Sequence, residues 1–318
     1  MSLNQLLLDI NDESKTILSP AFTTDVTQAY ILPSVDDQDI TFENFDDKTK
    51  KVKWVETCVL HIDLRQSTQL NLEQNPQTLA KLYSCFIRGT IKCAEYWGGK
   101  VRNIAGDRVM ILFDPKDCFK NAVNAAILLH TFSKFILRHH FRTAIIECGI
   151  GIDYGKMLAT KVGTIRRGTE TSGGESKTLV WLGRPANVAS KLADIANKTF
   201  SRLKIAVGYY YPFTNQFSEY EEEVVDFFDK VRMTGSYPIV AQLEPYAYTF
   251  GKKLVSYGYQ PILMTKSVFD GFKAACPTDK SVAEKWWKAR SVNVGGYTGV
   301  IYEGDVIFTF GQQLQQAR

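Results

Sequence analysis

Two aspartates, Asp63 and Asp107, occupy positions from which they could bind a metal ion. Asp63 ends a mostly apolar run in the segment VLHIDLRQST, and Asp107 lies in a glycine turn in the segment GGKVRNIAGDRVMILF. Taken singly, each carboxylate also fits a turn or cap residue. Two carboxylates held together repel each other unless a cation neutralises them, and hard oxygen ligands suit Mg²⁺ or Mn²⁺. The pair predicts a metal site if the fold brings the two segments together.

Two other segments carry groups suited to phosphate chemistry. Backbone N–H groups and hydroxyls that follow a strand can bind phosphate oxygens, and the residues after Asp63 that could do so are Leu64, Arg65, Gln66, Ser67 and Thr68. Asn187 and Lys191, in GRPANVASKLADIA, are four residues apart and therefore share one helix face. An amide and a cation on one face could hold a ribose and a developing phosphoryl charge, whereas this helix alone would also fit a solvated surface.

The elements that must position these residues follow a regular order from Trp54 onward. Apolar spacing predicts strands over 54–62, 100–105, 109–113 and 143–153, with helices over 79–94 and 122–135. The order strand–helix–strand–strand–helix–strand is the ferredoxin-like split βαβ arrangement of an α+β fold. In such a sheet the first strand and the hairpin are central neighbours, so we expect Asp63 to lie close to Asp107.

Several regions flank or interrupt this predicted core. Residues 1–53 combine an amphipathic stretch with acidic and basic blocks, and we expect an N-terminal extension that packs on the main domain or on a partner chain. The main domain is expected over 54–318, with a glycine-rich loop over 163–177 and an aromatic-rich insertion at about 199–256. The remaining expected elements are a helix from Gly183 through Asn197, a strand near 260–264, a helix to about Ala275 and strands within 291–310.

Composition excludes several classes of protein. The chain has 318 residues, 45% of them hydrophobic and 23% charged, and a net charge of +4, so it is neither disordered nor strongly basic. It has no apolar run long enough to span a membrane, and its first residues do not have the pattern that we would expect of a signal peptide. Six cysteines without a CxxC pair, and four histidines, argue against a zinc site. We expect a cytoplasmic protein with reduced thiols and with neither nucleic acid nor membrane as a partner.

In this order, the motifs resemble those of the class III nucleotidyl cyclases over residues 54–198, and more weakly over 257–310. HIDLRQST and GGKVRNIAGD resemble the two metal-binding segments, GIGIDYGKMLATKVG the strand and dimer arm, and GRPANVASKL the catalytic helix. The resemblance implies that Asp63 and Asp107 bind two Mn²⁺ or Mg²⁺ ions, assisted by the carbonyl of Leu64. It also implies that Asn187 orients the ribose and Lys191 stabilises the transition state, in a site shared across a head-to-tail homodimer.

The sequence departs from the purine cyclases where they recognise the base. Asn103 stands where those enzymes have a base-reading lysine, and Val180 where they have a second base reader. The triphosphate arginine falls near Gly149, and a late phosphate lysine near Gly295. Together with the N-terminal extension, these departures resemble the bacterial pyrimidine cyclases of the Pycsar anti-phage systems. The resemblance implies that UTP or CTP is converted into a cyclic nucleotide that activates a separate effector. We expect UTP, although an asparagine amide fits either base.

Three other functions remain open at this point. A catalytically inactive cyclase domain could act as a nucleotide sensor, in agreement with the missing arginine and altered base positions, although both metal aspartates are retained. A diguanylate cyclase on the related fold is disfavoured because the hairpin reads Ala105-Gly106-Asp107-Arg108 and lacks the GGDEF turn. RNA binding around Arg166 and Arg167 would rest on only two arginines in a flexible loop.

Overall fold

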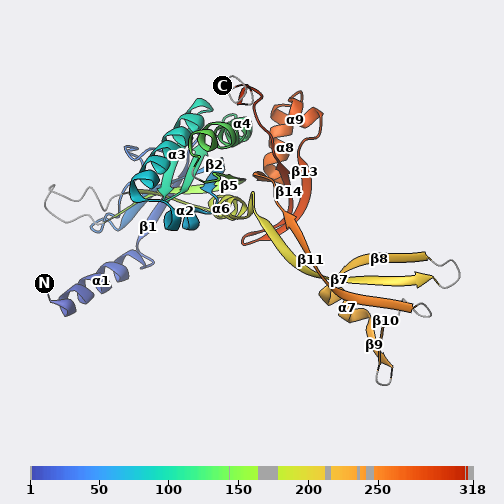
Figure 1. The fold of residues 1–318 in the computed structure, drawn as a ribbon. Helices are drawn as coiled ribbons and strands as arrows, with labels where there is room; N and C mark the ends of the chain where they lie inside the picture. Colours follow the sequence, from blue (N-terminus) through green and yellow to red (C-terminus); the bar gives the residue numbers. More distant parts are fainter. Residues whose placement is uncertain are drawn as a thin grey trace. The chain divides into compact units, whose positions relative to one another are not determined.

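The computed structural model of the protein describes residues 2–142, 144–163, 178–211, 216–234, 237–240, 247–311 and 313. The chain divides into two compact units, Met1–Asn197 with Gln260–Arg318, and Lys198–Tyr259. Figure 1 shows the elements of both units, coloured along the sequence. Thr143, most of the predicted glycine-rich loop, and Arg166 and Arg167 lie outside the described residues.

The first unit is built on a large mixed sheet whose centre has the predicted order. Its four central strands are β2 (Thr49–Leu64), β3 (Gly99–Ala105), β4 (Arg108–Phe113) and β5 (Cys148–Val162). They lie in the order β5-β2-β4-β3, and every neighbouring pair is antiparallel. This order, with a helix between β2 and β3 and another between β4 and β5, confirms the ferredoxin-like split βαβ arrangement.

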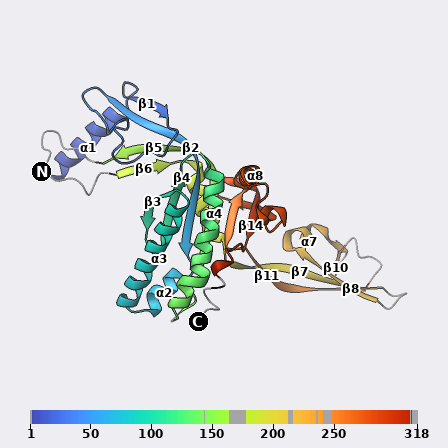
Figure 2. The same cartoon turned by 90° about the horizontal axis from the view of Figure 1, so that it is seen from above.

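Helices cover both faces of this sheet. α3 (Pro76–Tyr96) and α4 (Cys118–Thr131) pack on one face, where Leu60 and Ile62 of β2 belong to the main hydrophobic core with Phe86 of α3; Figure 2 shows both helices beside β2. α6 (Arg184–Ile195) lies on the other face, where its Ala189 packs with Val59 of β2. Because successive strand residues point to opposite faces, Asp63 lies on the α6 side.

Three more strands extend the sheet beyond β5 on the side away from β2. β12 (Ile262–Thr265) pairs with β5, β14 (Tyr297–Gly304) with β12, and β13 (Lys288–Val294) with β14. The intervening helices are α8 (Lys266–Ala275) and α9 (Lys280–Ala283). β6 (Thr178–Leu182) pairs instead with the far part of β5.

Several predicted boundaries are wrong. β2 begins at Thr49 and not at Trp54, and its first residues pair with β1 (Thr23–Gln28). β5 begins at Cys148, several residues later than expected, and continues to Val162, because its second half pairs with both the N-terminal part of β2 and β6. The last strand ends at Gly304, so the residues up to Phe310 are not part of a strand. α4 continues into a π-helix, η1 (Phe132–Leu137), and then into α5 (Arg138–His140); α2 (Ser67–Glu73) directly follows β2.

The N-terminal segment packs partly on the first unit. β1 (Thr23–Gln28) pairs in parallel with β2, and Leu32 and Ile40 are buried in the same core cluster as Val55. Helix α1 (Leu3–Ile17) buries none of its side chains. No helix among the described residues is both long and apolar enough to cross a membrane.

The second unit contains a three-stranded antiparallel sheet, a hairpin and one helix. Its elements are β7 (Thr199–Tyr211), β8 (Gln216–Glu223), α7 (Val224–Lys230), β9 (Val231–Thr234), β10 (Tyr237–Val240) and β11 (Ala247–Gly258). Ile205, Val207 and Phe227 form a small core. None of the residues singled out in the sequence as a site residue lies in this unit.

Candidate active site

The end of β2 lies beside the turn between β3 and β4. Asp63 is the register partner of Arg108, the residue that follows Asp107. Asp63 is buried, whereas Asp107 is half-buried and forms no ion pair with any residue that the structure describes. The charge of Asp107 is close enough to contribute to the raised pKa of Asp63. The structure therefore brings the two predicted carboxylates to one edge of the sheet.

Arg108 connects this edge to α6. Its guanidinium donates to Oδ2 of Asp63 at 2.9 Å, to the hydroxyl of Ser190 at 2.8 Å, and to the carboxylate of Asp194. Neither Arg108 nor Asp194 was among the residues selected from the sequence. The only sequence signal was the position of Arg108 directly after a predicted metal aspartate.

The side chain of Arg65 is buried and forms hydrogen bonds within the protein. Its side chain is 6% exposed, and it donates to Oδ2 of Asp63 at 3.2 Å and to the carbonyls of Ala193 and Asp194 at 2.5 and 3.0 Å. A cation that binds the last carbonyls of a helix stabilises its C-terminus. A Cβ atom on Gly149 would lie 2.5 Å from this guanidinium, so Arg65 fills the space that a side chain on β5 would need.

The two carboxylates suit a divalent cation by their chemistry. Burial raises the pKa of the Asp63 carboxyl above its ordinary value, while the ion pair with Arg108 acts in the opposite direction. Both arginine contacts of Asp63 use Oδ2, and Asp107 contributes a second carboxylate beside it. The described residues contain no cluster of three or more His, Cys, Asp or Glu side chains around this point. The oxygen donors that this edge offers are the carboxylates of Asp63 and Asp107, and hard oxygens are the ligands that Mg²⁺ and Mn²⁺ prefer.

The residues after Asp63 form the start of α2. Gln66 adopts a left-handed backbone conformation with a φ of 57° and directly precedes the helix, which begins at Ser67. Gln66 and Thr68 are exposed and Ser67 is half-buried. Gln66 and Thr68 are therefore accessible to solvent, in contrast to Arg65.

α6 approaches β5 very closely. A Cβ atom on Gly151 would lie 2.2 Å from the carbonyl oxygen of Ala189 and 2.4 Å from the nitrogen of Ala193. Proline in the first turn of the helix, at Pro185, needs no hydrogen-bond partner for its nitrogen. Asn187 and Lys191 both lie on the exposed side of α6, and the ammonium of Lys191 is 4.0 Å from Asp194.

A cavity of about 400 Å³ brings three predicted site residues together. Asn103 of β3, Val180 of β6 and Asn187 of α6 all line it. Trp181 forms part of the wall, and the guanidinium of Arg102 lies 5.5 Å from the centre of its ring. The volume is within the range of small-molecule sites. Asp63, Asp107 and Lys191 do not line this cavity.

His61 also lines the cavity and was not selected from the sequence. It lies on β2 two residues before Asp63, which places both side chains on the same face of the sheet. Burial, assisted by the positive charge of Arg108, lowers the pKa of His61 to about 4, so its imidazole is neutral at pH 7. Strand periodicity could have identified this residue, since HIDL places it beside the aspartate.

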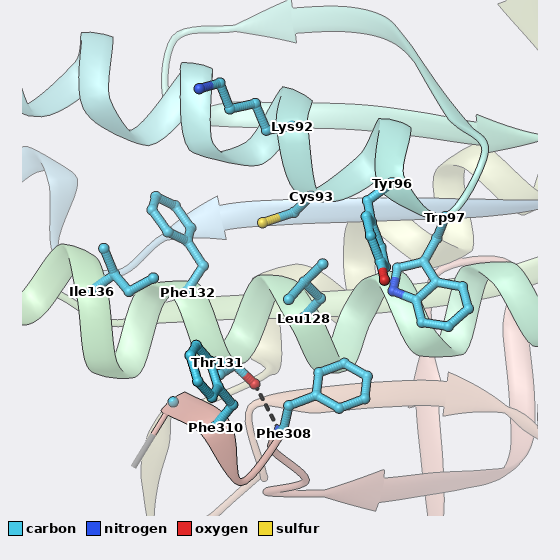
Figure 3. A pocket seen from close by; sticks show the side chains of 11 residues that line it. Lys92, Cys93, Tyr96, Trp97, Leu128, Thr131, Phe132, Ile136, Phe308 and Phe310 are labelled. Atoms are coloured by element: carbon cyan, nitrogen blue, oxygen red, sulfur yellow. Dashed lines mark hydrogen bonds between the residues drawn. The ribbon is translucent and has the colours of Figure 1, made fainter. Parts of the chain in front are cut away.

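A second cavity, of about 520 Å³, lies on the opposite side of the sheet between α3, α4 and η1 (Figure 3). Its walls are mostly aromatic and aliphatic, and Phe308 and Phe310 close one side. The backbone N–H of Phe308 donates to the hydroxyl of Thr131 at 3.0 Å. None of the residues that the sequence singled out for chemistry lines this cavity.

No protein-family model matches the chain. It is 28% identical over 152 residues to a uridylate cyclase from Propioniciclava tarda, a match that covers 46% of this chain and 47% of that protein. It is 30% identical over 106 residues to a cytidylate cyclase from Staphylococcus aureus, covering 31% of this chain and 25% of that protein. The matches thus span half or less of the length of these relatives.

Among solved structures, the adenylyl cyclase CyaB from P. aeruginosa is similar with a TM-score of 0.48 and 18% identity, over 79% of this chain and 94% of that chain. The fold expected from the motifs is confirmed by the strand order and by the position of the two aspartates at one sheet edge. The chain is therefore similar in sequence to curated uridylate and cytidylate cyclases over less than half of its length, and the order of its central strands is the one that the motifs predict.

Proposed function

We propose that the protein is a pyrimidine nucleotide cyclase that converts UTP into 3′,5′-cyclic UMP and pyrophosphate. The observation that carries this proposal is the cavity that unites Asn103, Val180 and Asn187, residues from three separate elements. Two of these positions are ones at which the sequence departs from the purine cyclases. The uridylate and cytidylate cyclases among the relatives support a pyrimidine base.

In the proposed reaction the ribose 3′-hydroxyl attacks the α-phosphorus, and the bond from this phosphorus to the pyrophosphate leaving group breaks. Divalent ions bound by Asp63 and Asp107, with the carbonyl of Leu64, would supply acidification of the hydroxyl and neutralisation of the triphosphate. The backbone N–H groups of residues 66–68 and the hydroxyls of Ser67 and Thr68 would bind phosphate oxygens. Because nucleophile and electrophile belong to one molecule, the protein mainly supplies position and charge.

Asn187 and Lys191 would act on the reacting end of the substrate. The amide of Asn187 reaches the cavity from α6 and would orient the ribose. The ammonium of Lys191 would neutralise developing phosphoryl charge as a point charge, since it lacks the two-pronged geometry of an arginine. Its nearest recorded partner is Asp194 at 4.0 Å, a distance at which the ammonium can turn to another anion.

We further propose that the site is completed by a second copy of the chain in a head-to-tail homodimer. Lys191 is exposed on α6 and does not line the cavity that contains Asn187. The carboxylate of Asp107, which forms no ion pair with any described residue, is likewise not part of the cavity lining. A partner subunit that presents its aspartates to this cavity would join the two halves. The cyclic nucleotide would then act as a second messenger on a separate effector in anti-phage defence.

The test is incubation of the purified protein with each of four nucleoside triphosphates and Mn²⁺ or Mg²⁺, with products resolved by mass spectrometry. The proposal predicts cyclic UMP as the main product. Cyclic CMP as the main product would keep the cyclase assignment and change the base. Faster production of cyclic AMP than of either pyrimidine product would contradict the base assignment, and nucleotide binding without any product would favour an inactive sensor.

A further inference from the structure

The candidate nucleotide cavity contains a buried imidazole for which none of the residues that the structure describes supplies a hydrogen-bond partner. His61 is 7% exposed, and neither of its ring nitrogens forms a hydrogen bond with any residue that the structure describes. Buried polar atoms are almost always paired, because an unpaired atom loses its hydration without compensation. A histidine at this place therefore calls for a partner from outside the chain.

The location of His61 restricts what that partner is. It comes from the centre of the sheet, with Met110 as its cross-strand neighbour, and it lines the cavity with Trp181 and Asn187. The carboxylates and Lys191, which suit the triphosphate, are not part of this lining. Trp181 and Met110 give the cavity planar and apolar walls, and the amides of Asn103 and Asn187 add polar groups. The one charged side chain in the described lining, Arg102, already donates to the carbonyl of Pro33. This mixed lining suits a heterocyclic base better than a phosphate.

The imidazole of His61 is buried, but no described residue hydrogen-bonds to it. His61 lines the cavity, both of its ring nitrogens are buried, and no hydrogen bond from a described residue fixes the orientation of the imidazole. Rotation about the Cβ–Cγ bond can turn one nitrogen toward a bound ligand. Asn103, by contrast, is exposed on β3 at the edge of the cavity, where water competes for its amide.

We propose that His61 is a base-reading residue that hydrogen-bonds the exocyclic group at C4 of a pyrimidine in this cavity. An imidazole has one donor and one acceptor nitrogen, so it can donate to O4 of uracil or accept from the amino group of cytosine. The inference rests on the proposed cyclase function but holds for either pyrimidine. It assigns recognition of the base to a residue of β2, in addition to the two positions, Asn103 and Val180, that the family resemblance suggests.

A mutant cycle with a modified substrate tests this contact. The substrates are UTP, CTP and the triphosphate of pyrimidin-2-one riboside, which lacks the group at C4. With wild-type protein, loss of this group should lower kcat/KM by roughly 10- to 100-fold, because it leaves the buried imidazole unpaired again. In His61→Phe the same loss should change kcat/KM by less than about 3-fold. His140→Phe, the same substitution at an exposed histidine of α5, should retain the wild-type ratio.

A binding measurement keeps the test independent of turnover and of the folding of the variant. Protein labelled with ¹⁵N-histidine is titrated with 3′-deoxy-UTP and 3′-deoxy-CTP, which cannot cyclise. The ring-nitrogen resonances of His61, assigned by comparison with His61→Gln, should shift on saturation while those of His140 stay in place.

Two results would overturn the assignment while leaving the cyclase proposal intact. In the first, loss of the group at C4 lowers kcat/KM as much in His61→Phe as in the wild-type protein. In the second, nucleotide binds but the resonances of the His61 ring nitrogens do not shift. If the wild-type protein neither binds nor converts any of the four nucleoside triphosphates, both the assignment and the cyclase proposal fail.

Discussion

Arg108 and Asp63 form an ion pair of 2.9 Å between β4 and β2, at the edge of the sheet where the second predicted metal ligand lies. Because Arg108 also binds Ser190 and Asp194, its guanidinium joins β2, the β3–β4 hairpin and α6. The same Asp63 carboxylate accepts from Arg65. A residue proposed to bind a metal ion is therefore also part of the packing between sheet and helix.

This arrangement predicts different outcomes for the two aspartates. Asp107→Asn should reduce product formation to background and leave thermal stability nearly unchanged, because Asp107 has no ion pair among the described residues. Asp63→Asn should abolish activity too, but it should also lower the free energy of unfolding by about 3 kcal/mol, since it removes the anionic partner of two arginines at a buried site. Mass spectrometry of products and chemical denaturation measure the two effects. Near wild-type turnover in either variant would refute the two-carboxylate metal site.

The proposed head-to-tail dimer can be tested by mixing two inactive variants. Asp107→Asn and Lys191→Ala alter different halves of the site, and each should be inactive alone. Each mixed dimer has two active sites, one with both halves altered and one with both halves intact. Because about half of the dimers are mixed after equal mixing, roughly a quarter of wild-type activity should return. If native mass spectrometry detects the mixed dimer and activity stays at background, the site does not assemble across chains.

The contact between β5 and α6 predicts a steric effect at Gly151. In Gly151→Ala the new Cβ would lie 2.2 Å from the carbonyl of Ala189, so α6 must shift away from the sheet and carry Asn187 with it. We expect a loss of about 3 kcal/mol in stability, together with a loss of activity. Gly251→Ala is the matched control, because a Cβ there meets nothing within 4 Å. Equal unfolding midpoints for the two variants would contradict this packing.

The group around Asp305 predicts an acid-sensitive contribution to stability. The side chains of His130 and Lys134 bind this carboxylate and lower its pKa from 3.8 to about 2. A carboxyl with a depressed folded-state pKa stabilises the fold above its unfolded pKa and loses that contribution as pH falls through the folded value. The stability difference between wild type and Asp305→Asn should be constant above about pH 5 and shrink between pH 4 and 2. Denaturation curves across this pH range measure the difference in free energy of unfolding. A difference that grows as the pH falls would contradict the prediction.

Local patterns in the sequence were sufficient for the central fold. Apolar residues at helical and strand spacing, with a glycine turn at Gly106, predicted the order of elements from Trp54 to β5, and this order implies that Asp63 and Asp107 are neighbours. The helix of Asn187 and Lys191 was predicted from Pro185 and the spacing of its apolar residues. These features depend on a few consecutive residues, so periodicity and turn chemistry determine them.

Only the tertiary structure decided how the side chains of that edge are used. Arg65 looks like a phosphate ligand beside Asp63 in the sequence, but its guanidinium binds the carbonyls at the end of α6, a helix more than a hundred residues away along the chain. The burial of His61 without a hydrogen bond to any described residue, and the cavity that it shares with Asn187, depend equally on contacts between distant segments. Such contacts are not encoded in local spacing, because burial and pairing are set by which strands and helices finally pack together.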